Sequence, residues 1–595
     1  MSDAKFIVGI DLGTTNSILA YTPAAADERG APAIRILELP QLIGPGAVAA
    51  REMLPSFIYM PADQDLAADA LALPWPREGT HIVGELARNR GAELPQRLIS
   101  SAKSWLCQTT VDRNQAILPW GSPAEIPKLS PVEASAAILG HIRQAWNHAM
   151  ARDDRDLVLE RQEIFLTVPA SFDAVARELT VQAASMAGLP DITLLEEPQA
   201  AFYAWIVAAG DNWREAVGAG DLVLVCDLGG GTSDFSLIRV SDVSGNLDLE
   251  RIAVGNHILV GGDNMDLALA YAVARQMAES GQKVDAWQMR ALWHTCRSAK
   301  EKILASLDTA AVPVSVLGRG SSLIGGTLKT ELSRAMVEQV IVEGFFPSCD
   351  PESRPRTVPR AGIQETGLAY EADPAVTRHL AQFLSRQDER PRELPTAVLF
   401  NGGVMKARLL QRRVTEVLTS WKGAAGLRVL EATNLDLAVA TGAAYYGLAR
   451  RGRGVRIRSG LNKSYYIGVA ASLPAVPGMP APIKALCVAP FGMEEGSATD
   501  LTEKEFNLIV GEPAKFDFLG SSLRTHDAAG SLIEDWEGDI EPITTIETTL
   551  DGTYGTVIPV SIQVRLTEIG TLELWCVSRT DGQRWKLEFN VRERT

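Results

Sequence analysis

Two segments of the sequence place aspartate, glycine and threonine in the same order. They run from Gly9 to Ser17 (GIDLGTTNS) and from Val225 to Asp234 (VCDLGGGTSD). In each, an apolar run ends in Asp-Leu-Gly, threonine follows in a tight turn, and a second apolar run returns. Glycine lets the backbone turn sharply, and successive backbone N–H groups in such a turn bind phosphate. The repeat predicts two similar lobes that face each other, each with a phosphate-binding turn.

The side chains in these turns suggest the rest of the ligand. Asp11 and Asp227 would repel phosphate directly, so their presence predicts a cation between carboxylate and phosphate, namely Mg²⁺ that keeps several waters. Ordinary hairpins with polar turns are the alternative, which the repetition weakens. No GxxxxGK[ST] motif occurs, so a P-loop is not predicted. The residues expected to bind the cofactor from these turns are Gly13, Thr14, Thr15, Asn16, Gly229, Gly230 and Gly231.

Three further segments carry possible site residues. In Leu194–Phe202 (LLEEPQAAF) a strand is expected to end at a carboxylate and a helix to begin at proline. Glu197 there either orients metal-bound water or is only a first-turn carboxylate favoured by the helix dipole. In Val398–Val404 (VLFNGGV) a strand runs into two glycines, a common way to seat a nucleotide. The helix that holds Asp436 has small residues spaced for close helix packing.

Composition limits the function classes. The 595 residues carry a net charge of −16, which disfavours sequence-independent binding to nucleic acid or anionic membrane. The six cysteines form no CxxC pair, so zinc ribbons and redox dithiols have no support. We find no apolar signal core and no run long enough to span a bilayer, and we expect a cytoplasmic protein.

Elements alternate between strand and helix patterns as far as about residue 450, which is typical of α/β layers. The strands expected are Phe6–Leu12, Ile164–Val168, Leu222–Leu228, Phe235–Val240 and Ala397–Phe400. The helices expected are Asp173–Ala187, Asn264–Glu279, Trp287–Leu307, Glu331–Phe345 and Leu435–Arg450.

The later part of the chain has a different character. Proline-rich Pro347–Pro359 and Leu473–Pro490 are interpreted as loops. An arginine-rich tract over residues 450–458 is interpreted as a solvated linker rather than a docking site. Alternating patterns in Val560–Leu566, Leu572–Val577 and Trp585–Val591, with Asp-Gly turns, predict a β-rich domain with hairpins.

These motifs, in this order, resemble the actin-like ATPase superfamily, and most closely the seventy-kilodalton heat-shock (DnaK-type chaperone) family. Gly9–Ser17 and the segment from Asp227 resemble its two phosphate loops, and Asn401–Val404 resembles its adenosine motif. The resemblance implies a two-lobed, ribonuclease-H-like ATPase domain over residues 1–450, an arginine-rich linker over 451–462, and a β-sandwich substrate-binding-like domain over 463–595. A helical lid is not expected behind those strands.

The resemblance also implies roles for single residues. Lys103 resembles the lysine that positions the attacking water, and Thr232 a phosphate contact that orients the terminal phosphate. Glu197 resembles the carboxylate that links nucleotide state to domain motion. Asp11 and Asp227 resemble the carboxylates that hold Mg²⁺ through water. The resemblance also makes Asp227 a catalytic residue. The remaining nucleotide contacts implied are Gly262, Lys300, Gly402, Gly403 and Asp436. The chain departs from the family pattern at Arg297, Glu301, Val404 and Lys406.

The implied function is that of a chaperone-like ATPase. ATP or ADP with Mg²⁺ would sit between the lobes, and nucleotide state would control binding of unfolded polypeptide by the β-domain. A J-domain co-chaperone and a nucleotide exchange factor are the implied partners. Two alternatives remain open, a small-molecule kinase and a filament-forming actin-like ATPase on the same fold.

Overall fold

The computed structural model describes most of the chain. The described residues are 4–25, 33–62, 65–77, 79–108, 111–243, 246–255, 258–306, 308–317, 327–357, 368, 370–385, 393–422, 426–431, 434–455, 461, 463–471, 482–494, 496–521, 523–524, 526–567 and 571–590. The chain divides into two compact units. The first unit comprises Met1–Leu247 with Arg251–Arg456, and the second Asp248–Glu250 with Ile457–Thr595.

The first lobe of the first unit is built on a mixed sheet, with strand order β11-β10-β1-β2-β3 and β6 paired to β2. These strands are β1 (Phe6–Leu12), β2 (Asn16–Pro23), β3 (Arg35–Ile36), β6 (Leu54–Pro55), β10 (Glu163–Val168) and β11 (Ile192–Glu196). Strand β1 runs antiparallel to β2 and parallel to β10, so the end of β1 opens beside the end of β10. The residues of β1 and β2 that face the interior are almost all apolar and buried, which fixes the register.

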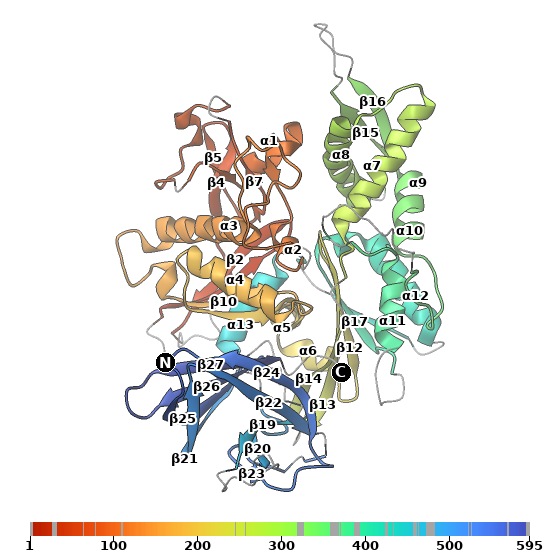
Figure 1. Ribbon diagram of the computed structural model, residues 1–595. Helices are drawn as coiled ribbons and strands as arrows, with labels where there is room; N and C mark the ends of the chain where they lie inside the picture. The colour runs from red at the N-terminus through yellow and green to blue at the C-terminus, as the bar shows by residue number, and fades with distance from the viewer. Residues whose placement is uncertain are drawn as a thin grey trace. The chain divides into compact units, whose positions relative to one another are not determined.

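The second lobe repeats this arrangement. Its sheet has the order β14-β13-β12-β17-β18, in which β12 runs antiparallel to β13 and parallel to β17. These strands are β12 (Leu222–Leu228), β13 (Ser233–Val243), β14 (Asn246–Val254), β17 (Ala397–Asn401) and β18 (Arg428–Leu430). Figure 1 shows the two lobes side by side, the first in red to orange and the second in yellow to cyan. The sequence repeat is thus a repeat of topology, as predicted.

Helices and small sheets complete both lobes. In the first lobe they are β4 (Leu39–Gly44), β5 (Ala47–Arg51), β7 (Ile58–Tyr59), β8 (Ile82–Val83), α1 (Glu85–Glu93), β9 (Leu98–Ile99), α2 (Ala102–Trp105), α3 (Pro131–Trp146), α4 (Ala174–Met186) and α5 (Glu197–Ala209). In the second they are α6 (Trp213–Ala216), α7 (Gly262–Glu279), α8 (Ala286–Ala305), β15 (Ala311–Val316), β16 (Leu328–Ser333), α9 (Arg334–Val337), α10 (Glu343–Phe345), α11 (Val376–Ser385), α12 (Arg408–Lys422) and α13 (Ala438–Arg450).

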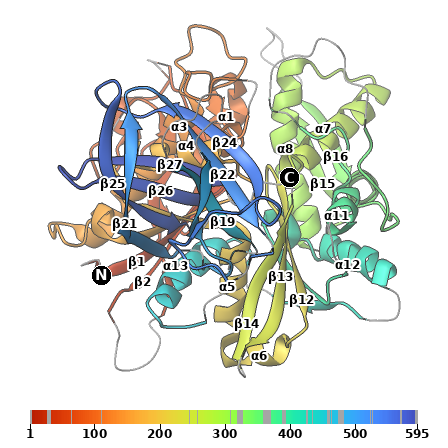
Figure 2. The ribbon, with the colours of Figure 1, turned by 60° about the horizontal axis from the view of Figure 1, so that its bottom comes forward.

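Helix α13 follows the last strand of the second lobe but packs on the first. It contacts β1, β2 and α5, and Figure 2 shows it beside β1 and β2. A Cβ atom on Gly442 would lie 1.7 Å from the backbone oxygen of Ala200, and one on Gly9 would lie 2.3 Å from that of Ala440. The small residues predicted to allow close helix packing therefore do so, and they let α13 pack closely on the first lobe.

One predicted helix in this unit is wrong in part. The helix expected over Glu331–Phe345 begins only at Arg334, because residues 331–333 belong to β16, which pairs with β15. The Ser333 side chain accepts a hydrogen bond from the Met336 N–H and caps the helix that follows. The helical spacing of the residues after Ser333 led us to predict a helix that also included the last residues of this strand.

The arginine-rich tract is not simply solvated. Arg451 Nε donates to Glu163 at 2.9 Å, and the Arg453 guanidinium donates to the backbone oxygen of Ala24 at 3.0 Å. The expectation of a solvated linker is therefore wrong for these two residues, because their side chains donate hydrogen bonds to the first lobe. Residues 456–460 and 462 lie outside the described residues.

The second unit is a β-sandwich. Its sheets have the orders β23-β20-β19-β22-β24 and β21-β25-β26-β27. The strands are β19 (Ser464–Ala470), β20 (Ile483–Ala489), β21 (Ala498–Val510), β22 (Pro513–Ser521), β23 (Leu532–Ile533), β24 (Glu541–Thr549), β25 (Thr556–Leu566), β26 (Thr571–Ser578) and β27 (Arg584–Asn590). Apolar residues of both sheets share one core, where the rings of Tyr465, Phe518 and Phe589 stack in series.

The loop predicted over Leu473–Pro490 is wrong in its second half. Strand β20 occupies residues 483–489, and Pro482 and Pro490 lie just outside its two ends. Proline interrupts a strand only where its missing N–H is needed, so prolines at both borders leave the strand intact. Residues 472–481 lie outside the described residues.

Among the described residues, none of the helices combines the length and apolar character that a membrane-spanning segment needs.

Candidate functional site

A cavity of about 830 Å³ lies in the first unit, between the two lobes. Both glycine turns open into it. The predicted site residues in its wall are Asp11, Gly13, Thr14, Thr15, Asn16, Lys103, Glu197, Asp227, Gly229, Gly230, Thr232, Gly262, Lys300, Gly402, Gly403 and Asp436. Gly231 is not part of the wall, and a Cβ atom there would lie 2.7 Å from the Ser104 hydroxyl oxygen. The structure thus brings together nearly every residue singled out in the sequence.

The two aspartates occupy equivalent positions in the two lobes. Asp11 lies opposite Thr167 on the parallel neighbour strand, and Asp227 lies opposite Asn401. The Thr167 hydroxyl donates to Asp11 Oδ1 at 3.2 Å, and Asn401 Nδ2 donates to Asp227 Oδ2 at 2.7 Å. Each carboxylate is therefore held by one side chain of the adjacent strand, and both residues line the cavity.

The turns approach each other too closely for side chains. A Cβ atom on Gly230 would lie 2.1 Å from Thr15 Oγ1 of the opposite turn. Gly402 has φ +83°, and a Cβ atom there would lie 2.2 Å from the backbone oxygen of Leu228. Glycine is needed at both positions, because any side chain would push the turns apart or strain the backbone.

Lys103 is buried between the lobes and forms an ion pair with Glu197. Burial alone would lower the pKa of Lys103, but the carboxylates of Glu197 and Asp11 outweigh it and raise that pKa. Lys103 is therefore positively charged, and its ion pair with Glu197 holds the ammonium group in place. Glu197 is the first residue of α5, directly after β11, as its predicted place at a strand end requires.

The acidic groups crowd one another. Burial, the main cause, raises the pKa of Asp227 to about 7, although the hydrogen bond from Asn401 opposes it. Burial likewise raises the pKa of Asp11, and Lys103 opposes that shift. For Glu197 burial again raises the pKa, and the nearby Asp11 and Asp227 add to the effect. Three carboxyl groups, those of Asp11, Asp227 and Glu197, lie near the single ammonium group of Lys103. The excess of negative charge favours binding of a further cation.

Helices α7 and α8 form the far wall of the cavity. Arg297 forms ion pairs with Asp263 and Asp266, and Lys300 Nζ lies 2.7 Å from Asp266 Oδ1. The predicted nucleotide-binding residue Lys300 thus lines the cavity with its charge already paired. Asp266, which lies one helical turn after Asp263, was missed in the sequence, where the i, i+3 spacing of these carboxylates was the available signal.

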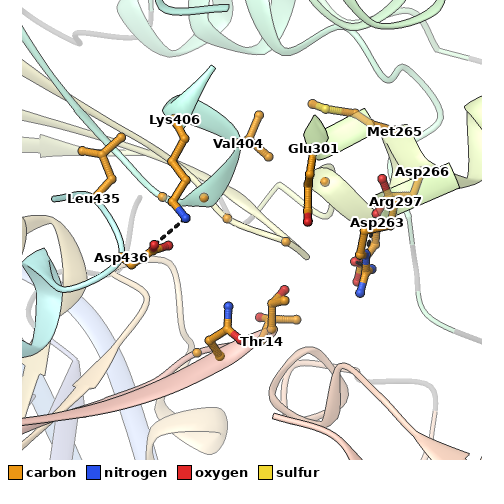
Figure 3. Close-up of a pocket in the computed structure, with 18 of the residues that line it drawn as sticks. Thr14, Asp263, Met265, Asp266, Arg297, Glu301, Val404, Lys406, Leu435 and Asp436 are labelled. Carbon is orange, nitrogen blue, oxygen red and sulfur yellow. Dashed lines mark hydrogen bonds and ion pairs between the residues drawn. The ribbon is translucent and has the colours of Figure 1, made fainter. Parts of the chain in front are cut away.

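Figure 3 shows part of the cavity wall, with residues of both lobes. The Lys406 side chain points to Asp436, with which it forms an ion pair, while Val404 and Glu301 face the cavity from the second lobe. The apolar side chains of Leu304 and Leu410 also line the cavity. The carboxylate of Glu301 points inward from α8, so this part of the wall presents acidic groups, Glu301 and Asp436, beside apolar ones.

The site fits a magnesium-bound nucleotide. Both glycine turns line the cavity, and the backbone N–H groups and threonine hydroxyls of such turns bind phosphate. Asp11 and Asp227 supply the carboxylate oxygens that Mg²⁺ prefers, directly or through water. Among the described residues, no three His, Cys, Asp or Glu side chains are grouped to ligate a metal by themselves.

Comparisons with known proteins assign the chain to a family. The Hsp70 protein family matches residues 50–351, which is about half of the chain. The chain belongs to the Hsp70 family, with a two-lobed α/β region of the actin-like type followed by β-rich sheets. The family assignment and the fold class predicted in the sequence are thereby confirmed.

Three chaperones of this family illustrate the similarity. The chain is 31% identical over 343 residues to the chaperone protein HscA of Enterobacter sp. (strain 638), an alignment that covers 57% of this chain and 48% of that protein. It is 32% identical over 351 residues to the HscA homolog of Pseudomonas paraeruginosa (strain DSM 24068 / PA7), covering 57% and 46%. It is 31% identical over 319 residues to HscA of Salmonella paratyphi C (strain RKS4594), covering 53% and 44%. The chain spans about half the length of the curated relatives it matches.

Proposed function

We propose that this chain hydrolyses ATP with Mg²⁺ and that its nucleotide state controls the binding of unfolded polypeptide segments by residues 463–595. One observation carries the proposal: two topologically equivalent Asp-and-glycine turns open into the same cavity as the Lys103–Glu197 ion pair. Membership of the Hsp70 family supports the same chemistry.

Each residue has a definite task in this proposal. Glu197 holds the Lys103 ammonium group in place, and Lys103 positions the attacking water. The Thr232 hydroxyl donates a hydrogen bond toward the terminal phosphate. Asp11 and Asp227 would hold Mg²⁺ through water, and the bound ion would neutralise negative charge that develops on the phosphate oxygens.

The second unit supplies the polypeptide-binding part of the proposal. Its support is the β-sandwich built by β19–β27, together with the polypeptide-directed role of the family. Nucleotide can control this unit only if ATP and ADP favour different arrangements of the chain. A J-domain co-chaperone and a nucleotide exchange factor complete the proposal, on the strength of the family resemblance, and we place the protein in the cytoplasm.

Single-turnover ATP hydrolysis by the full chain tests the catalytic assignment. Lys103→Ala and Thr232→Ala should each slow hydrolysis by about a hundredfold or more, because each removes a group aimed at the reacting phosphate. Lys302→Ala is the control, since Lys302 is exposed on α8 and does not line the cavity. An unfolded polypeptide should accelerate turnover of the unmodified chain.

Three results would contradict the proposal. Wild-type rates in both Lys103→Ala and Thr232→Ala would show that the site is assigned wrongly. Transfer of phosphate to a small-molecule hydroxyl would make the chain a kinase. Sedimentation of the chain as filaments that depends on ATP, without any effect of polypeptide, would favour an actin-like assembly protein.

A further inference from the structure

Ser101 has an unusual backbone conformation beside the site. Its φ is 55° and ψ 31°, in the left-handed region that residues other than glycine rarely adopt. It lies directly before α2, the short helix that carries Lys103. Such strain persists where surrounding contacts impose it, and it is common next to active sites. Ser101 itself does not line the cavity.

One such contact crosses from the first lobe to the second. The Ser101 hydroxyl donates to Asp263 Oδ2 at 3.0 Å, although the two residues are 162 positions apart. Asp263 lies at the start of α7, where its backbone N–H donates to the Gly230 oxygen at 2.8 Å. The hydrogen bond therefore reaches the turn that holds the second set of phosphate-binding groups.

Asp263 is itself fixed within the second lobe. Arg297 of α8 forms an ion pair with its carboxylate, and Trp293 Nε1 donates to its backbone oxygen at 3.2 Å. A hydrogen bond to such a fixed and charged acceptor is stronger than one between neutral groups. On the other side, the Ser104 N–H donates to the Ser101 oxygen at 3.0 Å and closes the turn that contains Lys103.

We propose that Ser101 is a positioning residue whose hydrogen bond to Asp263 couples the placement of Lys103 to closure of the two lobes around the phosphates. This inference rests on the proposed ATPase function. When the lobes close, the Ser101–Asp263 bond forms and holds α2 in the conformation that aims Lys103. When they open, the bond breaks and the strain at Ser101 favours movement of Lys103 away from its working position.

Three substitutions separate the hydroxyl from the backbone conformation. Ser101→Ala removes the donor, and Ser101→Gly removes the donor while relieving the left-handed strain. Ser101→Asn keeps a donor and tolerates this region of φ and ψ. Ser185→Ala, an exposed serine on α4, is the matched control. The readouts are the single-turnover hydrolysis rate and the nucleotide dissociation constant of the full chain.

We expect Ser101→Ala to lower the hydrolysis rate about tenfold, the effect of losing a hydrogen bond to a charged group, with a dissociation constant changed by less than about threefold. Ser101→Gly, which loses the donor but also the strain, should lower the rate by less than Ser101→Ala does. Ser101→Asn should keep the rate within about threefold of wild type. Adding Ser101→Ala to Asp263→Ala should cost less than about twofold more, because the acceptor is already gone. A wild-type rate in Ser101→Ala, or full additivity of the double variant, would overturn the proposal.

Hydrogen exchange separates this proposal from the proposed function. In the full chain, Ser101→Ala should raise amide exchange both in residues 102–106 and in the first turn of α7, whether or not nucleotide is hydrolysed. Absence of hydrolysis by the wild-type chain together with this exchange effect would contradict the ATPase function alone. Normal hydrolysis with unchanged exchange in both segments would contradict the role of Ser101 alone.

Discussion

At the scale of single residues, each charged group of the site depends on a neighbour fixed by the fold. Asp11 and Asp227 each accept a hydrogen bond from the adjacent parallel strand, and Lys103 is paired with Glu197. A carboxylate or ammonium group buried without such partners would cost several kcal/mol. The partners therefore let the chain keep charges buried in the cavity between the lobes, where they act more strongly on a ligand than they would in water.

A similar partnership in the second unit gives a prediction of pH dependence. Asp527 accepts hydrogen bonds from Arg524 Nε and from the Tyr466 hydroxyl, both at 2.7 Å. The hydrogen bond from Arg524 is the main cause that holds the pKa of Asp527 below its ordinary value of 3.8. Because the folded pKa is lower, the stabilisation is complete well above pH 3.8 and is lost as the pH falls through the folded pKa.

Asp527→Asn should therefore lower the free energy of unfolding by about 1–2 kcal/mol at pH 7, and by less at pH 3. Urea unfolding of the full chain at the two pH values measures the difference. Asp551→Asn, on an exposed turn of the same unit, is the control and should change little at either pH. An effect of Asp527→Asn that is equal at pH 7 and pH 3 would refute the role of the carboxylate charge.

At the scale of elements, the contact between α13 and α5 should be intolerant of side chains. A Cβ atom on Gly442 would collide with the Ala200 backbone at 1.7 Å, so Gly442→Ala should destabilise the chain by about 2–3 kcal/mol. Gly140 lies in the middle of α3 with no atom within 4 Å of such a Cβ, and Gly140→Ala should be neutral or stabilise by up to about 1 kcal/mol. Urea unfolding compares the two variants, and equal effects would show that the contact is looser than described.

Elements with strong local patterns could be predicted from the sequence, and those defined by distant contacts could not. Strands β1 and β12 have the predicted bounds, because apolar runs that end in Asp-Leu-Gly mark both their extent and the turns. Residues 331–333 were expected in a helix, since their pairing with β15 leaves no local signal. The Ser101–Asp263 contact was missed for the same reason, because nothing in either segment indicates its partner.

At the scale of the whole molecule, the first unit builds its candidate site from two lobes that contain sheets of the same topology. Two sheets of the same topology place their turns on opposite walls of one cavity, and α13, which follows the second sheet in the chain, packs on the first lobe where Gly442 and Gly9 allow close contact. A small relative movement of the lobes would change the distance between Asp11 and Asp227. Such a geometry makes the affinity for a bridging ligand sensitive to lobe closure, which is the property that a nucleotide-controlled switch requires.

The central claim is that the two turns hold one magnesium-bound nucleotide between them. Equilibrium binding of ATP to the full chain, with Mg²⁺ and with the metal removed by a chelator, tests it most directly. We predict that Asp11→Asn and Asp227→Asn each weaken binding at least about tenfold with Mg²⁺ present and change it by less than about threefold with chelator. A wild-type chain that binds no nucleotide, or variants that keep wild-type affinity with Mg²⁺, would contradict the account.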